Sequence, residues 1–124
     1  MQGIGVINGS LENAATVRPG STVGVLTLNG AYTQKSSGIL EIEIGGLNVG
    51  TEYDRLAVTG NVSFDGTLNV YLIDPFQPSS GNMFDIITYT GTRSGVFSTV
   101  NVPSLSGGLM WNLSYDPVVR LTVQ

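Results

Sequence analysis

The chain has 124 residues, a formal net charge of −4, no cysteine and no histidine. Its length predicts a single domain, 1–124, that is large enough to bury a hydrophobic core. The missing cysteines exclude a disulfide scaffold and a thiol nucleophile, and the missing histidines exclude a Ser-His-Asp triad and a His-ligated metal. We therefore expect a protein that is not an enzyme and that holds no cofactor and no metal.

Charge and hydropathy also limit the classes of partner that the protein can bind. Charged residues make up 11% of the chain, and their acidic balance argues against nucleic acid, which binds to a basic surface. No apolar run reaches the roughly 18 residues of a membrane-spanning helix. The segment Met1–Gly5 lacks the basic and apolar regions of a signal peptide. We therefore expect a fragment of a longer secreted protein, with the leader upstream of it.

The distribution of glycine and the hydrophobic period predict an all-β fold. The 17 glycines are spread throughout the chain, and glycine costs about 1 kcal/mol in a helix interior. Between them, apolar and polar residues alternate with a period of two, which is typical of strands buried on one face. The alternation runs, in chain order, through residues 40–44, 56–59, 67–72, 109–115 and 120–123.

The apolar positions of these segments predict the core, and proline and glycine between them predict the turns. The predicted core residues are Leu26, Leu28, Leu40, Ile42, Ile44, Leu56, Val58, Leu68, Val70, Leu72, Phe84 and Ile86. The predicted turn residues are Pro19, Gly20, Gly30, Gly45, Gly46, Gly60 and Gly66. Large aromatic residues, among them Tyr32, Phe64, Phe84 and Phe97, are expected to plug the ends or lie over the core.

Two architectures fit this pattern of strands. One is a parallel solenoid whose rungs stack, and the other is a sandwich of antiparallel hairpins. The pairs Asn29-Gly30 and Asp65-Gly66 are typical of hairpin turns and keep the antiparallel sandwich open as an alternative. No clear internal repeat is visible, although a solenoid with rungs of different lengths need not show one.

A series of short strings in a fixed order favours the solenoid. The strings are ATVRPGS (15–21), GVLTLNGAYTQ (24–34), GILEIEIGG (38–46), YDRLAVTG (53–60), GTLNV (66–70), GNMFDII (81–87) and GVF (95–97). Their order and spacing resemble the C-terminal part of passenger domains in autotransporter-like bacterial secreted surface proteins and adhesins. The resemblance covers about residues 11–100.

This resemblance implies a right-handed parallel β-helix, or β-solenoid, with a C-terminal cap. Residues 1–80 would form rungs and residues 81–124 the cap-like end. It further implies an extracellular location at the bacterial cell surface and a non-enzymatic, structural and adhesive function, in which the cap templates the folding of the rest of the passenger. The partner would be the rest of the parent passenger chain. How the parent protein is anchored stays open.

Several polar residues allow a chemical interpretation and a structural one. Asp54, between Tyr53 and Arg55, is either a catalytic carboxylate or cation ligand, or an Asx turn or Asp–Arg pair at a strand entry. Glu41 and Glu43 share one strand face. They are either a pair of catalytic carboxylates, as in a glycosidase, or two charged residues on a solvent-exposed strand face. We expect the structural interpretation for all three.

Two ligand hypotheses remain from the sequence. The acidic residues Glu52, Asp54 and Asp65 would have to gather to bind calcium. Tyr71 shares an outward strand face with Asn69, which hints at a surface that binds glycans.

Two further functions stay open beside the structural one. A self-assembling β protein would pair its exposed strand edges with other copies of itself and form oligomers or filaments. A carbohydrate-binding module would bind a surface glycan.

Overall fold

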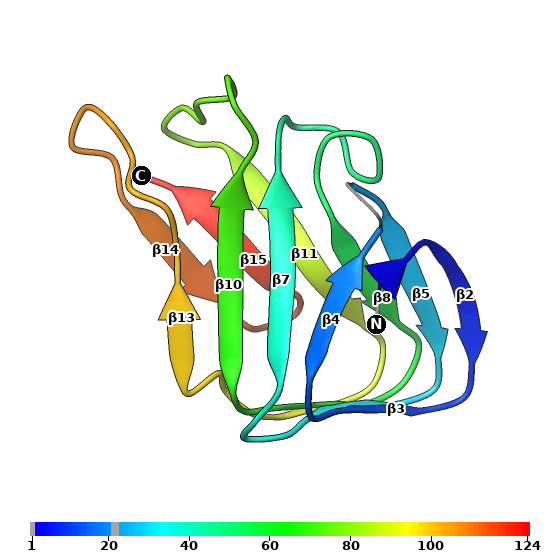
Figure 1. The fold of residues 1–124 in the computed structure, drawn as a ribbon. Helices are drawn as coiled ribbons and strands as arrows, with labels where there is room; N and C mark the ends of the chain where they lie inside the picture. The colour runs from blue at the N-terminus through cyan, green and yellow to red at the C-terminus, as the bar shows by residue number, and fades with distance from the viewer. Residues whose placement is uncertain (1, 21–22) are drawn as a thin grey trace.

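The computed structural model describes residues 2–20 and 23–124, which form strands joined by turns and loops (Figure 1). β-Branched residues and leucine alternate with small polar residues along most strands, a pattern that favours a half-buried pleated surface. Among the described residues no helix is long and apolar enough to cross a membrane. The predicted all-β class is confirmed.

The strands form three sheets. Sheet 1 has the order β1 (Gln2–Gly3), β4 (Thr16–Pro19), β7 (Ile39–Ile44), β10 (Thr67–Leu72) and β13 (Thr99–Asn101). Sheet 2 has the order β14 (Trp111–Ser114), β15 (Val119–Val123), β11 (Met83–Tyr89), β8 (Arg55–Val58), β5 (Val25–Asn29) and β2 (Gly5–Asn8). Sheet 3 has the order β12 (Arg93–Gly95), β9 (Val62–Phe64), β6 (Tyr32–Gln34) and β3 (Leu11–Asn13).

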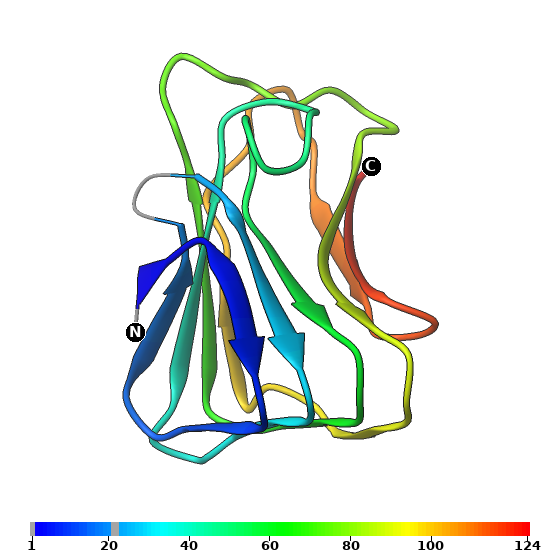
Figure 2. The same ribbon diagram turned by 90° about the vertical axis from the view of Figure 1, so that its right-hand side faces the viewer.

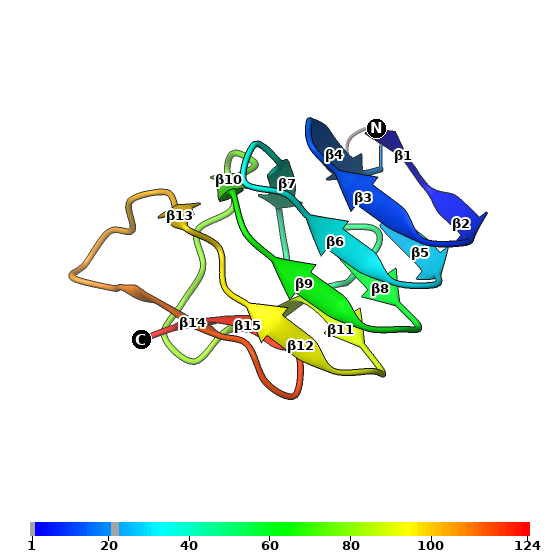
Figure 3. The ribbon, with the colours of Figure 1, turned by 90° about the horizontal axis from the view of Figure 1, so that it is seen from below.

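The chain visits the sheets in a repeating order. It passes from sheet 2 to sheet 3 to sheet 1 and then returns to sheet 2, so that β2–β3–β4, β5–β6–β7, β8–β9–β10 and β11–β12–β13 form four units of three strands. Each strand of a unit pairs in parallel with the corresponding strand of the next unit. Figure 3, seen from below, shows β3, β6, β9 and β12 side by side along one face of this stack.

The antiparallel β-sandwich is wrong for this chain. Asn29-Gly30 and Asp65-Gly66 do not close hairpins, because the first joins β5 to β6 and the second joins β9 to β10, and these strands belong to different sheets. Gly66 has a φ of +66°, and this backbone conformation turns the chain around a corner as readily as it closes a hairpin. A two-residue turn sequence predicts that the chain changes direction, but it does not predict whether the two flanking strands pair with each other.

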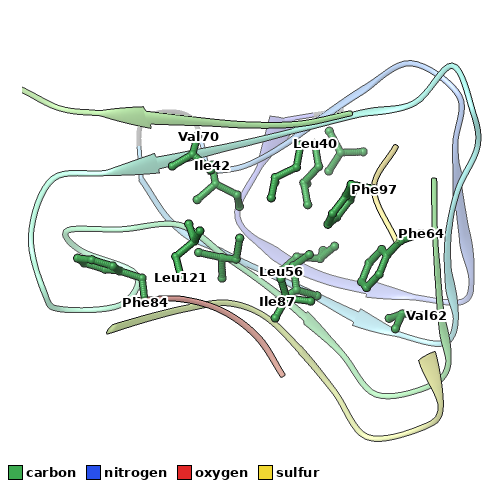
Figure 4. Packing of buried hydrophobic residues seen from close by; sticks show 14 of the residues in the cluster. Leu40, Ile42, Leu56, Val62, Phe64, Val70, Phe84, Ile87, Phe97 and Leu121 are labelled. Atoms are coloured by element: carbon green, nitrogen blue, oxygen red, sulfur yellow. The ribbon is translucent and has the colours of Figure 1, made fainter. Parts of the chain in front are cut away.

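The three sheets enclose one hydrophobic core (Figures 2 and 4). Side chains at equal positions of successive units lie in columns, as in the register Leu26–Leu56–Ile87 across sheet 2. Every predicted core residue is buried except Leu72, which is partly exposed. The aromatic residues that were expected to plug the ends or lie over the core, Tyr32, Phe64, Phe84 and Phe97, are all buried. Burial of apolar surface stabilises such a core by about 25 cal/mol per Å².

Buried polar side chains tie sheet 3 to sheet 1. The Asn13 amide donates to the Tyr32 hydroxyl at 3.1 Å and to the Ile39 carbonyl at 2.9 Å, and the Tyr32 hydroxyl donates to Gln34 Oε1 at 2.6 Å. Gln34 Nε2 in turn donates to the carbonyl of Asp65, in the next unit, at 2.9 Å. These hydrogen bonds satisfy backbone groups that would otherwise be buried without a partner.

Glycine allows the corners of successive units to stack at close range. A Cβ at Gly30 would lie 2.4 Å from the Gly9 carbonyl oxygen, and a Cβ at Gly60 would lie 2.6 Å from the Gly30 carbonyl oxygen. Both contacts involve backbone of the preceding unit, so a side chain there would push two units apart. The predicted turn residues Gly30 and Gly60 are thus needed for close approach.

Replacing a corner glycine should loosen the stack. We expect Gly60→Ala to lower the free energy of unfolding by about 1–3 kcal/mol, because the added methyl group overpacks against the Gly30 backbone. Ser36→Ala, at an exposed turn position, is the matched control and should change stability by less than about 0.5 kcal/mol. Urea unfolding followed by circular dichroism measures both, and equal stabilities of the two variants would contradict the close-approach argument.

A charge in the core should abolish folding. Ile42 is fully buried on the inner side of β7, and an unpaired carboxylate there costs several kcal/mol, a large part of the roughly 5–15 kcal/mol of a native domain. We expect Ile42→Asp to lose its cooperative thermal transition. Thr67→Asp, which places the same group on the outer face of β10, should keep it. A soluble Ile42→Asp variant with an unchanged melting temperature would contradict the assignment.

Candidate functional site

Among the described residues, the end of the stack formed by β1, β2 and β3 has no further strand beside it. Strands β1, β2 and β3 are the end strands of the three sheets, and they lie at the same end of the stack. Their neighbours show what is missing: Leu28 and Tyr32 are fully buried, whereas Ile7 and Leu11, paired with them in the first unit, remain partly exposed. Among the described residues this end therefore presents open strand edges above an incompletely covered core.

Exposed apolar side chains add to this edge. Ile4 is 70% exposed and Val6 is 61% exposed, although both belong to or adjoin β2. The positions that correspond to Val6 in the next two strands of sheet 2 carry Thr27, which is less apolar, and Ala57, which is smaller. Unpaired edges with exposed apolar residues are sites at which another strand adds, because backbone groups and apolar surface are both available.

Sheet 2 has a different structure at the other end of the stack. The edge of β11 pairs antiparallel with β15, and β15 pairs antiparallel with β14. Leu121 on β15 is fully buried, and the guanidinium of Arg120 donates to Asp85 on β11 at 2.5 Å. Antiparallel pairing interrupts the parallel order here, so a further parallel unit has no free β11 edge to join.

A cluster of aromatic rings joins β9 to the loop between β14 and β15. The Phe64 and Phe97 rings are stacked with centroids 4.7 Å apart, and the Tyr115 ring lies 6.1 Å from each. The Arg93 guanidinium lies 5.1 Å from the centre of the Tyr115 ring, and it also pairs with Asp116. Hydrogen bonds from Arg93 and then from the Tyr89 hydroxyl lower the pKa of Asp116 to about 2.

The outer face of sheet 1 carries a separate, polar groove. Arg18 on β4, Glu41 and Glu43 on β7, and Tyr71 on β10 line a space of about 270 Å³. Arg18 Nε donates to Glu41 Oε1, and the Tyr71 hydroxyl donates to Glu41 Oε2 at 3.1 Å. Glu43 lies directly beside Tyr71 in the register of β7 and β10.

The charges in this groove are unequal. Glu41 is paired with Arg18, whereas neither carboxylate oxygen of Glu43 has a hydrogen-bond partner among the described residues. Partial burial raises the pKa of Glu43, Arg18 opposes this shift, and the neighbouring Glu41 adds to it. The groove thus combines a fixed ion pair with one carboxylate that is free to accept hydrogen bonds.

Asp54 lies behind the groove as a buried structural carboxyl group. It is 1% exposed, and its two oxygens accept hydrogen bonds from the backbone N–H groups of Gly24 at 2.8 Å and Glu43 at 2.9 Å. It therefore joins the entry of β5 to β7 and holds the backbone of Glu43. The sequence offered an Asp–Arg pair for Asp54, but Arg55 instead donates to the Asp85 carbonyl at 2.7 Å and, at 3.2 Å, to the Tyr53 hydroxyl.

The calcium hypothesis is not supported by the geometry. Glu52 Oε1 accepts hydrogen bonds from Asn48 in the loop after β7, whereas Asp65 accepts from the Gly66 N–H at the start of β10. Because β7 and β10 run in parallel, these two carboxylates lie at opposite ends of sheet 1. Within residues 2–20 and 23–124, no group of three or more candidate metal ligands gathers.

Sequence reasoning identified part of the groove and missed the rest. It placed Tyr71 outward, and Tyr71 is 46% exposed. It also placed Glu41 and Glu43 together on the outer face. Arg18 was missed, because it reaches Glu41 only after β4 and β7 pair, and 23 residues separate the two. The buried amides Asn13 and Gln34 were missed for the same reason.

Comparison of the sequence with protein-family models gave no match, and no curated protein proved similar to it. The resemblance to autotransporter passengers therefore stays a prediction. Two features of the structure bear on function: the uncovered edge formed by β1–β3 and the polar groove on sheet 1.

Asp54 should make the stability of the protein depend on pH. Burial raises the pKa of Asp54 from 3.8 to about 7, against the opposing effect of its two backbone hydrogen bonds. Between these values the folded chain binds a proton that the unfolded chain has released, so the free energy of unfolding falls as the pH rises from about 4 to 7.

Asp54→Asn removes this titration and is the variant to compare. We expect the wild-type protein to lose more stability than the variant between pH 4 and 7, measured by urea unfolding at closely spaced pH values. The amide also disturbs one backbone hydrogen bond at every pH, so the slopes are compared and not the absolute stabilities. Parallel slopes for the two proteins would contradict the buried, proton-binding Asp54.

Proposed function

We propose that the chain is the end module of a right-handed parallel β-solenoid and that it receives a further coil of chain on the edge formed by β1–β3. The observation that supports this proposal is a difference in burial between residues that pair in register in successive units. Ile7 and Leu11 are partly exposed, whereas Leu28 and Tyr32, one unit further on, are fully buried. One more coil would pair with the three free edges and complete the core above them.

The other end of the stack supports a role as a terminal module. Antiparallel β15 and β14 continue sheet 2 beyond β11 and cover Phe84, whose ring lies 6.0 Å from the Trp111 ring. In this proposal residues 81–124 act as the C-terminal cap. At this end β12 and β13 are still edge strands, and only sheet 2 is extended. In this proposal that extension closes the end to further coils, and the edge formed by β1–β3 offers a template on which the next coil folds, since each solenoid coil is stabilised mainly by its nearest neighbour.

The absence of histidine and cysteine from the sequence favours a structural function over an enzymatic one. The resemblance to autotransporter passengers supports an extracellular setting at the bacterial cell surface. In that setting the coil received by β1–β3 belongs to the parent passenger chain, and the module serves to fold and stabilise an adhesive solenoid.

The template can be tested by supplying the missing coil. Residues 25–54, which contain β5, β6, β7 and the following loop, are repeated directly in front of Gly5. We expect the amides of Val6–Asn8 to exchange with deuterium at least about tenfold more slowly, because the added coil bonds to β2 and covers Ile7. The melting temperature should also rise.

The control repeats the same residues with Ser in place of the inward Leu26, Leu28, Leu40 and Ile42 of the added copy. It should leave the exchange of Val6–Asn8 unchanged, since the added segment has no apolar face to bury. Equal protection by both inserts, or by neither, would contradict the proposal.

Self-association through the same edge is the competing outcome. Light scattering behind size exclusion, across a concentration series of the unmodified chain, separates the two possibilities. A monomer at all concentrations, with β2 and β3 amides exchanging rapidly, supports an edge reserved for another part of the parent chain. Discrete oligomers in which these amides are protected would show that copies of the chain fill the edge, and would replace the template with assembly.

A further inference from the structure

We propose that the groove lined by Arg18, Glu41, Glu43 and Tyr71 on the outer face of sheet 1 binds a neutral saccharide chain. This site lies on the side of the stack, on β4, β7 and β10. It does not include the edge formed by β1–β3, so it is independent of the proposed template function.

Tyr71 supplies the first element of saccharide recognition. Its side chain is 46% exposed on an otherwise polar face. Its hydroxyl donates to Glu41 Oε2 at 3.1 Å, and Glu41 is itself held by Arg18. The ring is therefore exposed and yet fixed in orientation before any ligand arrives, which lowers the entropy cost of binding. An aromatic ring of this kind stacks on the apolar face of a pyranose.

Glu43 supplies the second element. Its carboxylate lies next to Tyr71 and has no hydrogen-bond partner among the described residues. A carboxylate only accepts hydrogen bonds, and sugar hydroxyl groups are the matching donors. The Asp54 carboxyl group accepts the Glu43 N–H from behind and fixes the strand at this position, so the acceptor is also held in place.

The groove charge selects among ligands. Glu41 and Glu43 carry two negative charges against the one positive charge of Arg18, so an anionic ligand such as a phosphate or a uronic acid is repelled. A metal ion has only the oxygens of two carboxylates, one of them already occupied by Arg18 and Tyr71. A neutral ligand with many hydroxyl groups is not repelled by the carboxylates and does not need them as metal ligands.

The same face continues beyond the groove as a row of polar side chains. Arg18, Glu41, Asn69 and Asn101 lie at successive strands of sheet 1, and Asn101 Nδ2 donates to Asn69 Oδ1 at 2.8 Å. Adjacent strands are about 4.8 Å apart, close to the length of one pyranose unit along a glycan. The hydrogen-bonding groups of the row are therefore spaced at about the same interval as the sugar units of a glycan. A linear chain of several sugars fits this spacing better than a single sugar.

The groove volume agrees with a small polar ligand. A space of about 270 Å³ lies just under the range of ordinary ligand pockets, about 300–1,000 Å³. Only part of a saccharide chain is then enclosed, and the rest lies along the open face. We accordingly expect weak binding, with dissociation constants in the high micromolar to millimolar range.

The experiment titrates the full chain with neutral linear tetrasaccharides of glucose, galactose, mannose or N-acetylglucosamine, and monitors amide and side-chain NMR shifts. We expect at least one of them to shift the signals of Tyr71, Glu43 and Asn69. Tyr71→Ala should weaken that binding at least about tenfold, which is 1.4 kcal/mol. Tyr71→Phe keeps the ring, loses the bond to Glu41, and should weaken it less.

Tyr89→Phe is the matched control, because the Tyr89 hydroxyl also donates to a carboxylate, that of Asp116, but lies outside the groove. It should bind like the wild-type chain, and all variants should keep the wild-type far-UV spectrum. No shift with any neutral tetrasaccharide would overturn the proposal. So would stronger binding of oligogalacturonate, a response to calcium alone, or equal loss in Tyr71→Ala and Tyr89→Phe.

Discussion

In-register stacking of one unit on the next is the constraint on which the rest of this structure depends. The backbone of each inner unit is hydrogen-bonded mainly to its two neighbours, and the inward side chains form columns such as Leu26–Leu56–Ile87. A shift of one residue would turn each column toward solvent. The corner glycines and the buried Gln34 amide, which bonds to the Asp65 carbonyl of the next unit, hold this register.

The sequence predicted what depends on neighbouring residues and failed where distant residues meet. Alternation along 40–44 and 67–72 correctly separated inward leucine and isoleucine from outward Glu41, Glu43 and Tyr71. Alternation alone left parallel and antiparallel pairing open, because the choice is decided by contacts between units, and the parallel order was expected only from the resemblance. Asn29-Gly30 and Asp65-Gly66 have the same local chemistry at a corner as in a hairpin. Arg18 and Glu41 become neighbours only through that pairing.

The two candidate sites follow from the same stacking in different ways. Stacking stops at β1–β3 with free edges, which gives a surface suited to another coil. Stacking across β4, β7, β10 and β13 lines up outward side chains in rows, which gives sheet 1 a surface of regularly spaced polar groups. The edge formed by β1–β3 lies at the end of the stack, whereas the polar face of sheet 1 lies along its side. The two surfaces do not overlap, so a single chain has room for both functions.

The corners differ in how much chain they contain. Sheet 2 leads to sheet 3 through the tight stacked glycines, whereas sheet 1 returns to sheet 2 through long loops, 45–54 and 73–82, that gather at the top of Figure 1. Asn29 follows its stacked partner Asn8 by 21 residues, but Thr92 follows Asn61 by 31. Most of the difference in length between units therefore falls on one rim of the molecule, beside the groove, where new loops can arise in evolution or be grafted by design while the stack stays unchanged.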